Sequence, residues 1–201
     1  MSSLPQNVDP ARYTQGPERY VHFAEEVLDL ATTSIDHGLA RGQPMEPDLV
    51  AVSEPLQAQR ASFVTLRRAG ELRGCIGTLE AHRPLAQDVA TNAFGAAFRD
   101  PRFPPLDAGE RKAITVKIEV LSVPEPLSFT GEADLLAQLV PGEDGLVLEA
   151  GRHKGTFLPT VWQQLPDPEQ FWAHLKRKAG LPADAAPDGM RVYRYRTEVL
   201  P

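Results

Sequence analysis

The segment Ile114–Leu121 alternates apolar and polar side chains without a break, and it constrains the fold more than any other stretch. Successive side chains of a strand point to opposite faces of the sheet, so the alternation separates two faces. The apolar face carries Ile114, Val116, Ile118 and Val120, and the polar face carries Thr115, Lys117 and Glu119. This pattern predicts a half-buried strand of an antiparallel sheet that is covered on one side.

Three further segments have apolar residues at helical spacing. The first begins after Pro17, includes Tyr20 to Ile35, and ends at Gly38 and Gly42. The second begins at Pro84 and is rich in alanine, so we expect it to pack close to a sheet. It ends at Asp100–Pro105, because a residue before proline is disfavoured in a helix. The third, Glu169–Ala179, begins after Pro168 and ends at Gly180.

The remaining apolar segments predict short strands. Residues 61–67 and 72–79 form a hairpin around a turn at 68–70, and residues 145–149 and 155–158 form a second pair joined by 150–154. Residues 127–129 and 190–199 are further strands, with a short helix at 134–139 and a helical turn near Leu56. Strands and helices do not alternate strictly, so we predict an α+β fold with a mostly antiparallel sheet flanked by helices.

Length and composition limit the class of protein. Residues 1–16 are expected to be a loose lead-in, and residues 17–201 to hold one core or two small lobes. The net charge of −6 argues against nucleic acid or anionic membrane as a partner. The polar stretch 1–10 does not match a secretory signal, and no apolar run approaches about 20 residues. We therefore expect a cytoplasmic protein.

The single cysteine, Cys75, lies in the sequence Leu-Arg-Gly-Cys-Ile-Gly at 72–77. In an extended segment Arg73 and Cys75 share a face, and a guanidinium beside a thiol favours the thiolate, which is the nucleophilic form. The alternative is a small buried hydrophobe, with Glu71 neutralising Arg73. One cysteine cannot form an internal disulfide or a multi-cysteine zinc or iron–sulfur site, so we predict no metal and no cofactor.

The loop Asp100–Phe103 is a candidate ligand-binding segment. Asp100 and Arg102 either form an ion pair that shapes the loop, or Arg102 joins Arg73 to hold a carboxylate or phosphate. Asn92 either adds an amide to that site or is a polar residue on an exposed helix face.

A second candidate is the run Arg152–Lys154 between two glycines. Donor-bearing side chains in a tight turn can form an anion pocket together with backbone N–H groups. A solvated hairpin tip is the alternative for these residues. The remaining histidines have no metal-ligand spacing, and no nucleophilic triad or phosphate-binding glycine loop is present.

Several unusual segments follow one another in a fixed order, and together they resemble the AMMECR domain family from about residue 17 to residue 199. Short bacterial members of this family are called AmmeMemoRadiSam system protein A. The segments are residues 63–66, 72–79, 92–103, 118–120, 142–146, 155–159 and 178–181. The resemblance implies an α+β fold with a larger and a smaller lobe, and it implies no established activity. It also implies two companions, a radical S-adenosylmethionine enzyme and a Memo-like protein. A [4Fe–4S] cluster needs more thiolates than Cys75 supplies, so the radical chemistry would belong to the companion.

Two functional hypotheses follow. In the first, the chain is an enzyme or enzyme subunit in which Cys75 is a nucleophile or thiol carrier, and Arg73 favours its thiolate. Arg102 and Lys154 would then orient a small anionic molecule. In the second, the chain is a non-catalytic partner that docks on its companions or delivers substrate to them, and Cys75 with its glycines serves close packing of the sheet.

Overall fold

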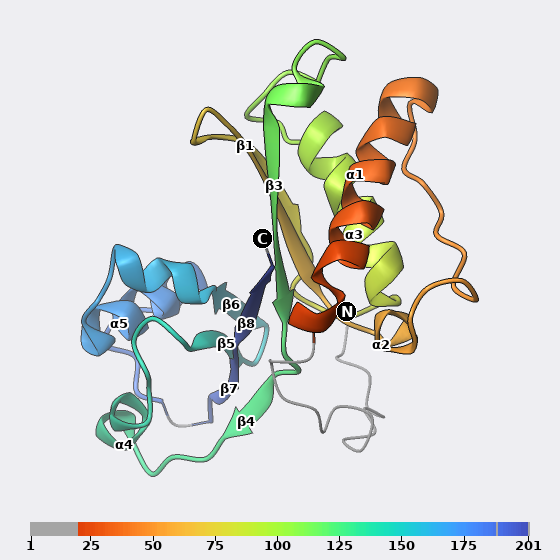
Figure 1. The fold of residues 1–201 in the computed structure, drawn as a ribbon. Coiled ribbons are helices and arrows are strands. Elements are labelled where there is room, and N and C mark those ends of the chain that lie inside the picture. The colour runs from red at the N-terminus through yellow and green to blue at the C-terminus, as the bar shows by residue number, and fades with distance from the viewer. Residues whose placement is uncertain (1–19, 188, 201) are drawn as a thin grey trace. The chain divides into compact units, whose positions relative to one another are not determined.

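The computed structural model describes residues 20–187 and 189–200. These residues divide into two compact units, the first containing 20–122 with 198–200 and the second containing 123–197. Each unit has its own four-stranded sheet and its own hydrophobic core (Figure 1). The predicted α+β class is confirmed, and its sheets are antiparallel.

The sheet of the first unit has the strand order β2-β1-β3-β8. Its strands are β1 (Ser62–Arg68), β2 (Glu71–Gly77), β3 (Ile114–Leu121) and β8 (Thr197–Leu200). The β1–β2 hairpin turns at Ala69 and Gly70, whose φ angles are 51° and 83°. Positive φ at both central residues matches the twist of the paired strands, so this turn holds β2 beside β1.

Helices cover one face of this sheet (Figure 1). Those that lie against it are α1 (Ala24–Arg41) and α3 (Leu85–Phe98), and the unit also contains the 3-10 turn η3 (Val21–Phe23), α2 (Glu54–Gln57) and the 3-10 turn η4 (Arg111–Ala113). Apolar residues of α1 and α3 share a core with Val64 and Ile118, so the apolar face predicted for residues 114–121 is the covered one. Gly42, with φ of 72°, ends α1 as expected.

Glu198 on β8 joins the end of the described chain to the beginning of the first helical segment. Its carboxylate accepts hydrogen bonds from the backbone N–H groups of Tyr20, at 3.1 Å, and of Val21, at 2.6 Å. The first N–H groups of a helix have no intrahelical partner. The buried Glu198 side chain supplies that partner, and this fixes β8 in the first unit.

The sheet of the second unit has the strand order β4-β7-β5-β6. Its strands are β4 (Glu125–Leu127), β5 (Gly145–Ala150), β6 (His153–Phe157) and β7 (Arg191–Tyr195), and its helices are α4 (Glu132–Ala137), the 3-10 helix η5 (Pro159–Gln163) and α5 (Pro168–Lys178). The rings of Trp162 and Phe171 stack in its core with centroids 3.8 Å apart. The helix predicted over residues 169–179 is α5, and its aromatic residues lie in the core of the second unit, as the pattern indicated.

Several predicted elements differ from the structure. The short strand expected over residues 127–129 is β4, at Glu125–Leu127. The single strand expected over residues 190–199 is two strands, β7 and β8, in different sheets. Val192 belongs to the core of the second unit and Leu200 to the core of the first, so the chain passes between sheets at Arg196. The loop expected over residues 150–154 is a turn at Gly151 and Arg152, because His153 and Lys154 are already paired in β6. The predicted lead-in lies outside the described residues, and none of the described helices is long and apolar enough to cross a membrane.

Candidate functional site

Arg73 and Cys75 lie on β2, the edge strand of the first sheet, next to an irregularity in its pairing. Leu66 pairs with Gly74, whereas Arg67 pairs with Leu72, so Arg73 is an extra residue on the β2 side. A bulge of this kind bends the strand and re-aims side chains, and bulges are common beside functional sites. Here both Arg73 and Cys75 contact the segment 100–110.

Cys75 is half-buried, and three groups contact it. Its sulfur lies 3.4 Å from the hydroxyl of Thr65, the residue opposite it on β1. Its backbone N–H donates to Oδ2 of Asp100 at 2.8 Å, and its carbonyl accepts from Nη2 of Arg102 at 3.2 Å. An edge strand presents backbone N–H and C=O groups that no neighbouring strand pairs. At Cys75, Asp100 pairs with the N–H group and Arg102 pairs with the C=O group.

Asp100 and Arg102 form a bidentate ion pair. Nε of Arg102 lies 2.9 Å from Oδ1 of Asp100, and Nη2 lies 2.7 Å from Oδ2. This contact holds the pKa of Asp100 well below its usual range, and it raises the pKa of Arg102. The guanidinium of Arg102 also donates to the backbone carbonyl of Cys75, so it lies beside the residue that carries the thiol. The carboxylate is 2% exposed and the guanidinium side chain 53% exposed, so only the cation faces solvent.

Arg73 is buried and paired with a residue that the sequence analysis did not select. Its Nε and Nη2 donate to Glu110 at 3.0 and 2.8 Å, and Nη2 also donates to the carbonyl of Pro104 at 3.0 Å. Hydrogen bonding to Arg73 lowers the pKa of Glu110 to about 2. Glu110 also binds Arg68 at 2.9 Å. Glu110, rather than the expected Glu71, neutralises Arg73, and the pair anchors the segment 100–110 to the hairpin.

Phe103 connects the two arginines of the site. Its ring centroid lies 5.9 Å from the guanidinium carbon of Arg73 and 5.6 Å from that of Arg102. Cations within about 6 Å of an aromatic face are attracted to it. The ring therefore helps to hold Arg102 beside Cys75, a role that no feature of the sequence indicated.

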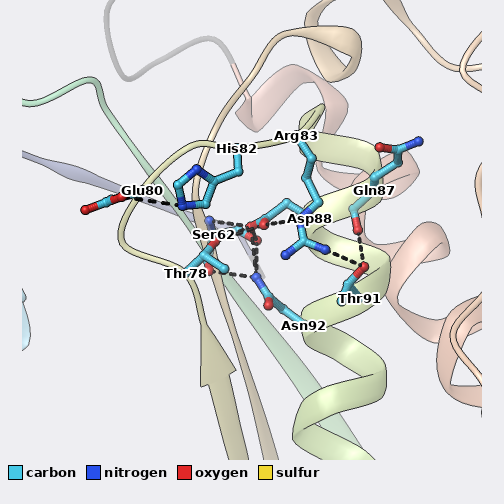
Figure 2. Close-up of polar contacts among 9 residues, drawn as sticks. All are labelled: Ser62, Thr78, Glu80, His82, Arg83, Gln87, Asp88, Thr91 and Asn92. Carbon is cyan, nitrogen blue, oxygen red and sulfur yellow. Dashed lines mark hydrogen bonds and ion pairs between the residues drawn. The ribbon is translucent and has the colours of Figure 1, made fainter. Parts of the chain in front are cut away.

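Asn92 belongs to a different cluster, centred on the carboxylate of Asp88 (Figure 2). Its amide donates to Asp88 at 2.8 Å and to the carbonyl of Ser62 at 3.0 Å. Asp88, 1% exposed, also accepts from the N–H and hydroxyl of Ser62, from Thr78 and from Arg83. Burial raises the pKa of Asp88, and the hydrogen bonds from Ser62 and Thr78 oppose that shift. Asn92 is thus buried inside a bonded cluster that joins α3, β1 and the residues after β2.

Arg152 and Lys154 belong to the second unit. Lys154 lies on β6 with its Nζ 3.5 Å from a carboxylate oxygen of Glu149, which also pairs with Arg191 at 3.0 Å. Arg152 is exposed in the turn. Across the described residues, no group of three or more His, Cys, Asp or Glu side chains is placed to hold a metal ion.

Comparison with known proteins identifies relatives along most of the chain. Residues 28–200 match the model of the AMMECR1 family. A protein from Methanothermobacter thermautotrophicus is 41% identical over 144 residues, covering 71% of this chain and 75% of the relative. A protein from Thermotoga maritima is 34% identical, covering 91% of this chain and 97% of the relative. The crystal structure of an uncharacterized protein from Pyrococcus horikoshii superposes with a TM-score of 0.75 at 32% identity, covering 89% of this chain and 90% of that one.

Proposed function

The chain belongs to the AMMECR1 family, and on that premise we propose that Cys75 is the reactive centre of an enzyme or enzyme subunit acting on a small anionic molecule. The thiolate of Cys75 serves as nucleophile or thiol carrier, and Arg102 binds the negative charge of the molecule. The observation that carries this proposal is the hydrogen bond from the half-exposed guanidinium of Arg102 to the backbone carbonyl of the half-buried Cys75, which places a cation beside the residue that carries the thiol.

The geometry supports a ligand role for Arg102 in particular. Asp100 takes Nε and Nη2, and Nη1 has no hydrogen-bond partner among the described residues. A planar guanidinium binds carboxylate and phosphate well, and a cation beside a thiol favours the thiolate. A molecule bound at Nη1 would therefore be held beside the residue that carries the thiol.

Arg73 has a different part in this proposal. Its guanidinium is 9% exposed and bound to Glu110, so Arg73 acts on the reaction by fixing the loop that carries Arg102. This makes Arg73 a positioning residue and Arg102 the cation that touches the reacting molecule.

The test is alkylation of the native protein by iodoacetamide, in which a new S–C bond forms and iodide leaves. With one cysteine in the chain, the signal has a single source. We expect the native thiol to react, and Arg102→Ala to slow the reaction about tenfold, since a neighbouring cation is lost. Arg152→Ala, which removes an exposed arginine from the second unit, is the matched control and should react as the wild type does. A thiol that reacts only after denaturation contradicts the proposal.

A second candidate function rests on exposed apolar residues near the same strand. Leu72 and Leu79 are 39% and 41% exposed, and they lie on either side of Cys75 in the sequence. Exposed large apolar side chains are frequent at docking surfaces. Here the chain would dock on the two companions that the family resemblance implies, the radical S-adenosylmethionine enzyme and the Memo-like protein. Titration calorimetry with each purified companion tests this. Leu72→Asp and Leu79→Asp should weaken binding at least tenfold, and absence of wild-type binding rejects it.

A further inference from the structure

We propose that Thr65 is a positioning residue whose hydroxyl donates a hydrogen bond to the sulfur of Cys75 and holds the thiolate for reaction. This inference rests on the proposed function of Cys75, and it adds to the nearby cation of Arg102 a donor that reaches the sulfur itself. Thr65 lies in the family segment 63–66, to which the sequence analysis gave no chemical role.

The strand register places the two side chains together. Thr65 and Cys75 are directly opposite in the β1–β2 pairing, and Oγ1 lies 3.4 Å from Sγ. Directly opposite side chains of an antiparallel pair are within contact distance. Thr65 is β-branched and therefore restricted at χ1, so its hydroxyl has a defined direction.

The hydroxyl of Thr65 is not committed elsewhere. Its contact with Cys75 is the only hydrogen bond it makes among the described residues. Lys117, the neighbour of Thr65 on the other side in β3, bonds Glu119 at 2.9 Å instead. The proton of the hydroxyl is therefore available to the sulfur.

Thr65 and Arg102 approach Cys75 from different elements of the first unit. Thr65 stands on β1, which is paired on both sides, by β2 and by β3. Arg102 stands on a loop that Asp100 and Phe103 hold in place. A hydrogen bond to the charged form of a group favours that form. Arg102 thus supplies charge and Thr65 supplies a fixed direction, which sets the orientation in which the sulfur meets its substrate.

The experiment compares Thr65→Val, which keeps the shape and removes the hydroxyl, with Thr65→Ser, which keeps the hydroxyl. Thr115→Val makes the same chemical change at an exposed position of β3 and is the control. We expect Thr65→Val to slow iodoacetamide alkylation about tenfold at neutral pH, the effect of one hydrogen bond to a charged acceptor. The pH profile of the rate should move to higher pH. Thr65→Ser and Thr115→Val should match the wild type.

The infrared S–H stretching band, recorded at a pH where the sulfur carries its proton, gives a readout that does not depend on reactivity. The chain has one thiol, hence one band, and Thr65→Val should displace it while Thr65→Ser should not. A band and an alkylation profile unchanged in Thr65→Val overturn the inference. If the thiol of the native wild type fails to react, the proposed function fails. The infrared band still tests the hydrogen bond from Thr65 in that case, and a band that is not displaced in Thr65→Val overturns it.

Discussion

The carboxylate of Asp100 accepts a hydrogen bond from the backbone N–H of Cys75 at 2.8 Å, and so attaches a loop to the open edge of the sheet. The same carboxylate binds Arg102 through two hydrogen bonds. One buried side chain therefore fixes the strand, the loop and the cation relative to one another. Asp100 therefore preorganises Cys75 and Arg102 for the reaction that we propose.

Asp100→Asn should loosen this arrangement. The amide would keep the shape of the carboxylate but lose the charge that binds Arg102, and one of its donor hydrogens would face a guanidinium. We expect a loss of about 1 to 3 kcal/mol in the free energy of unfolding, measured by urea denaturation. Asp29→Asn, on the exposed side of α1, makes the same change and should leave stability within about 0.5 kcal/mol of the wild type. Equal stabilities of the two variants would contradict the role given to Asp100.

Glu110 should make the protein sensitive to acid. Its pKa is lowered from 4.5 to about 2 in the folded chain. A carboxylate with a depressed pKa stabilises the fold above its unfolded pKa, and this contribution disappears as pH falls through the folded pKa. Glu110→Gln should therefore cost about 2 to 4 kcal/mol at pH 7, because Arg73 is left buried without its counter-ion. Urea denaturation from pH 7 to pH 2 should show the difference from wild type shrinking below about pH 4.5, and a constant difference would refute this assignment.

The elements of the first unit could be predicted because their patterns are local. The alternation in Ile114–Leu121 and the apolar stripe of α1 each reflect one covered face, and Gly42 ends α1 through its backbone alone. The division of residues 190–199 could not be predicted in this way. Both strands are apolar and extended, and only their different cores, marked by Val192 and Leu200, separate them.

Part of the candidate site could also be predicted, because some of its residues are recognisable by their type and their place in the sequence. Arg73, Cys75, Asp100 and Arg102 stood out by residue type, and the structure brings them around one strand and one loop. Their pairing could not be read from the chain. Glu110 meets Arg73 from 37 residues away, and such a contact depends on where the loop returns to the sheet. Asn92 resembled a ligand residue because an amide in a sequence carries no sign of burial.

Asp88 should be among the most sensitive polar positions of the first unit. Asn at this position would point its amide hydrogens at the N–H of Ser62 or at the amide of Asn92, which both donate to the carboxylate now. Buried donors would then have no acceptor. We expect a loss of about 2 to 4 kcal/mol at pH 7 by urea denaturation. Asp134→Asn, at an exposed position in helix α4 of the second unit, serves as the comparison and should cost clearly less than Asp88→Asn.

The contribution of Asp88 to the stability of the wild type changes with pH in the opposite direction to that of Glu110. Burial raises its folded pKa, so its contribution to stability is largest when it is protonated and falls as pH rises through that pKa. The penalty of the Asp88→Asn variant relative to wild type should therefore not shrink at low pH as that of Glu110→Gln does. If the stability losses of Asp88→Asn and of Glu110→Gln, each relative to the wild type, both disappeared in acid, the two carboxylates would titrate alike. That outcome would contradict the opposite pKa shifts assigned to them.

Gly74, next to Cys75, should tolerate no side chain. A Cβ at this position would collide with the backbone carbonyl of Ala96 on α3, which cannot move aside as a flexible side chain could. We expect Gly74→Ala to lower the free energy of unfolding by about 2 to 3 kcal/mol through overpacking. Gly109→Ala, whose Cβ would meet only the end of the Asp107 side chain, should cost far less in the same denaturation experiment.

The result would also separate the two readings of the Cys75 segment. Close packing concerns the face of β2 that carries Gly74, and thiol chemistry concerns the groups around Cys75. Gly74→Ala should therefore reduce stability while the alkylation rate of the folded fraction stays near that of the wild type, whereas Thr65→Val should slow alkylation with little change in stability. If both variants changed the same property, packing and reactivity would not be separable on this strand.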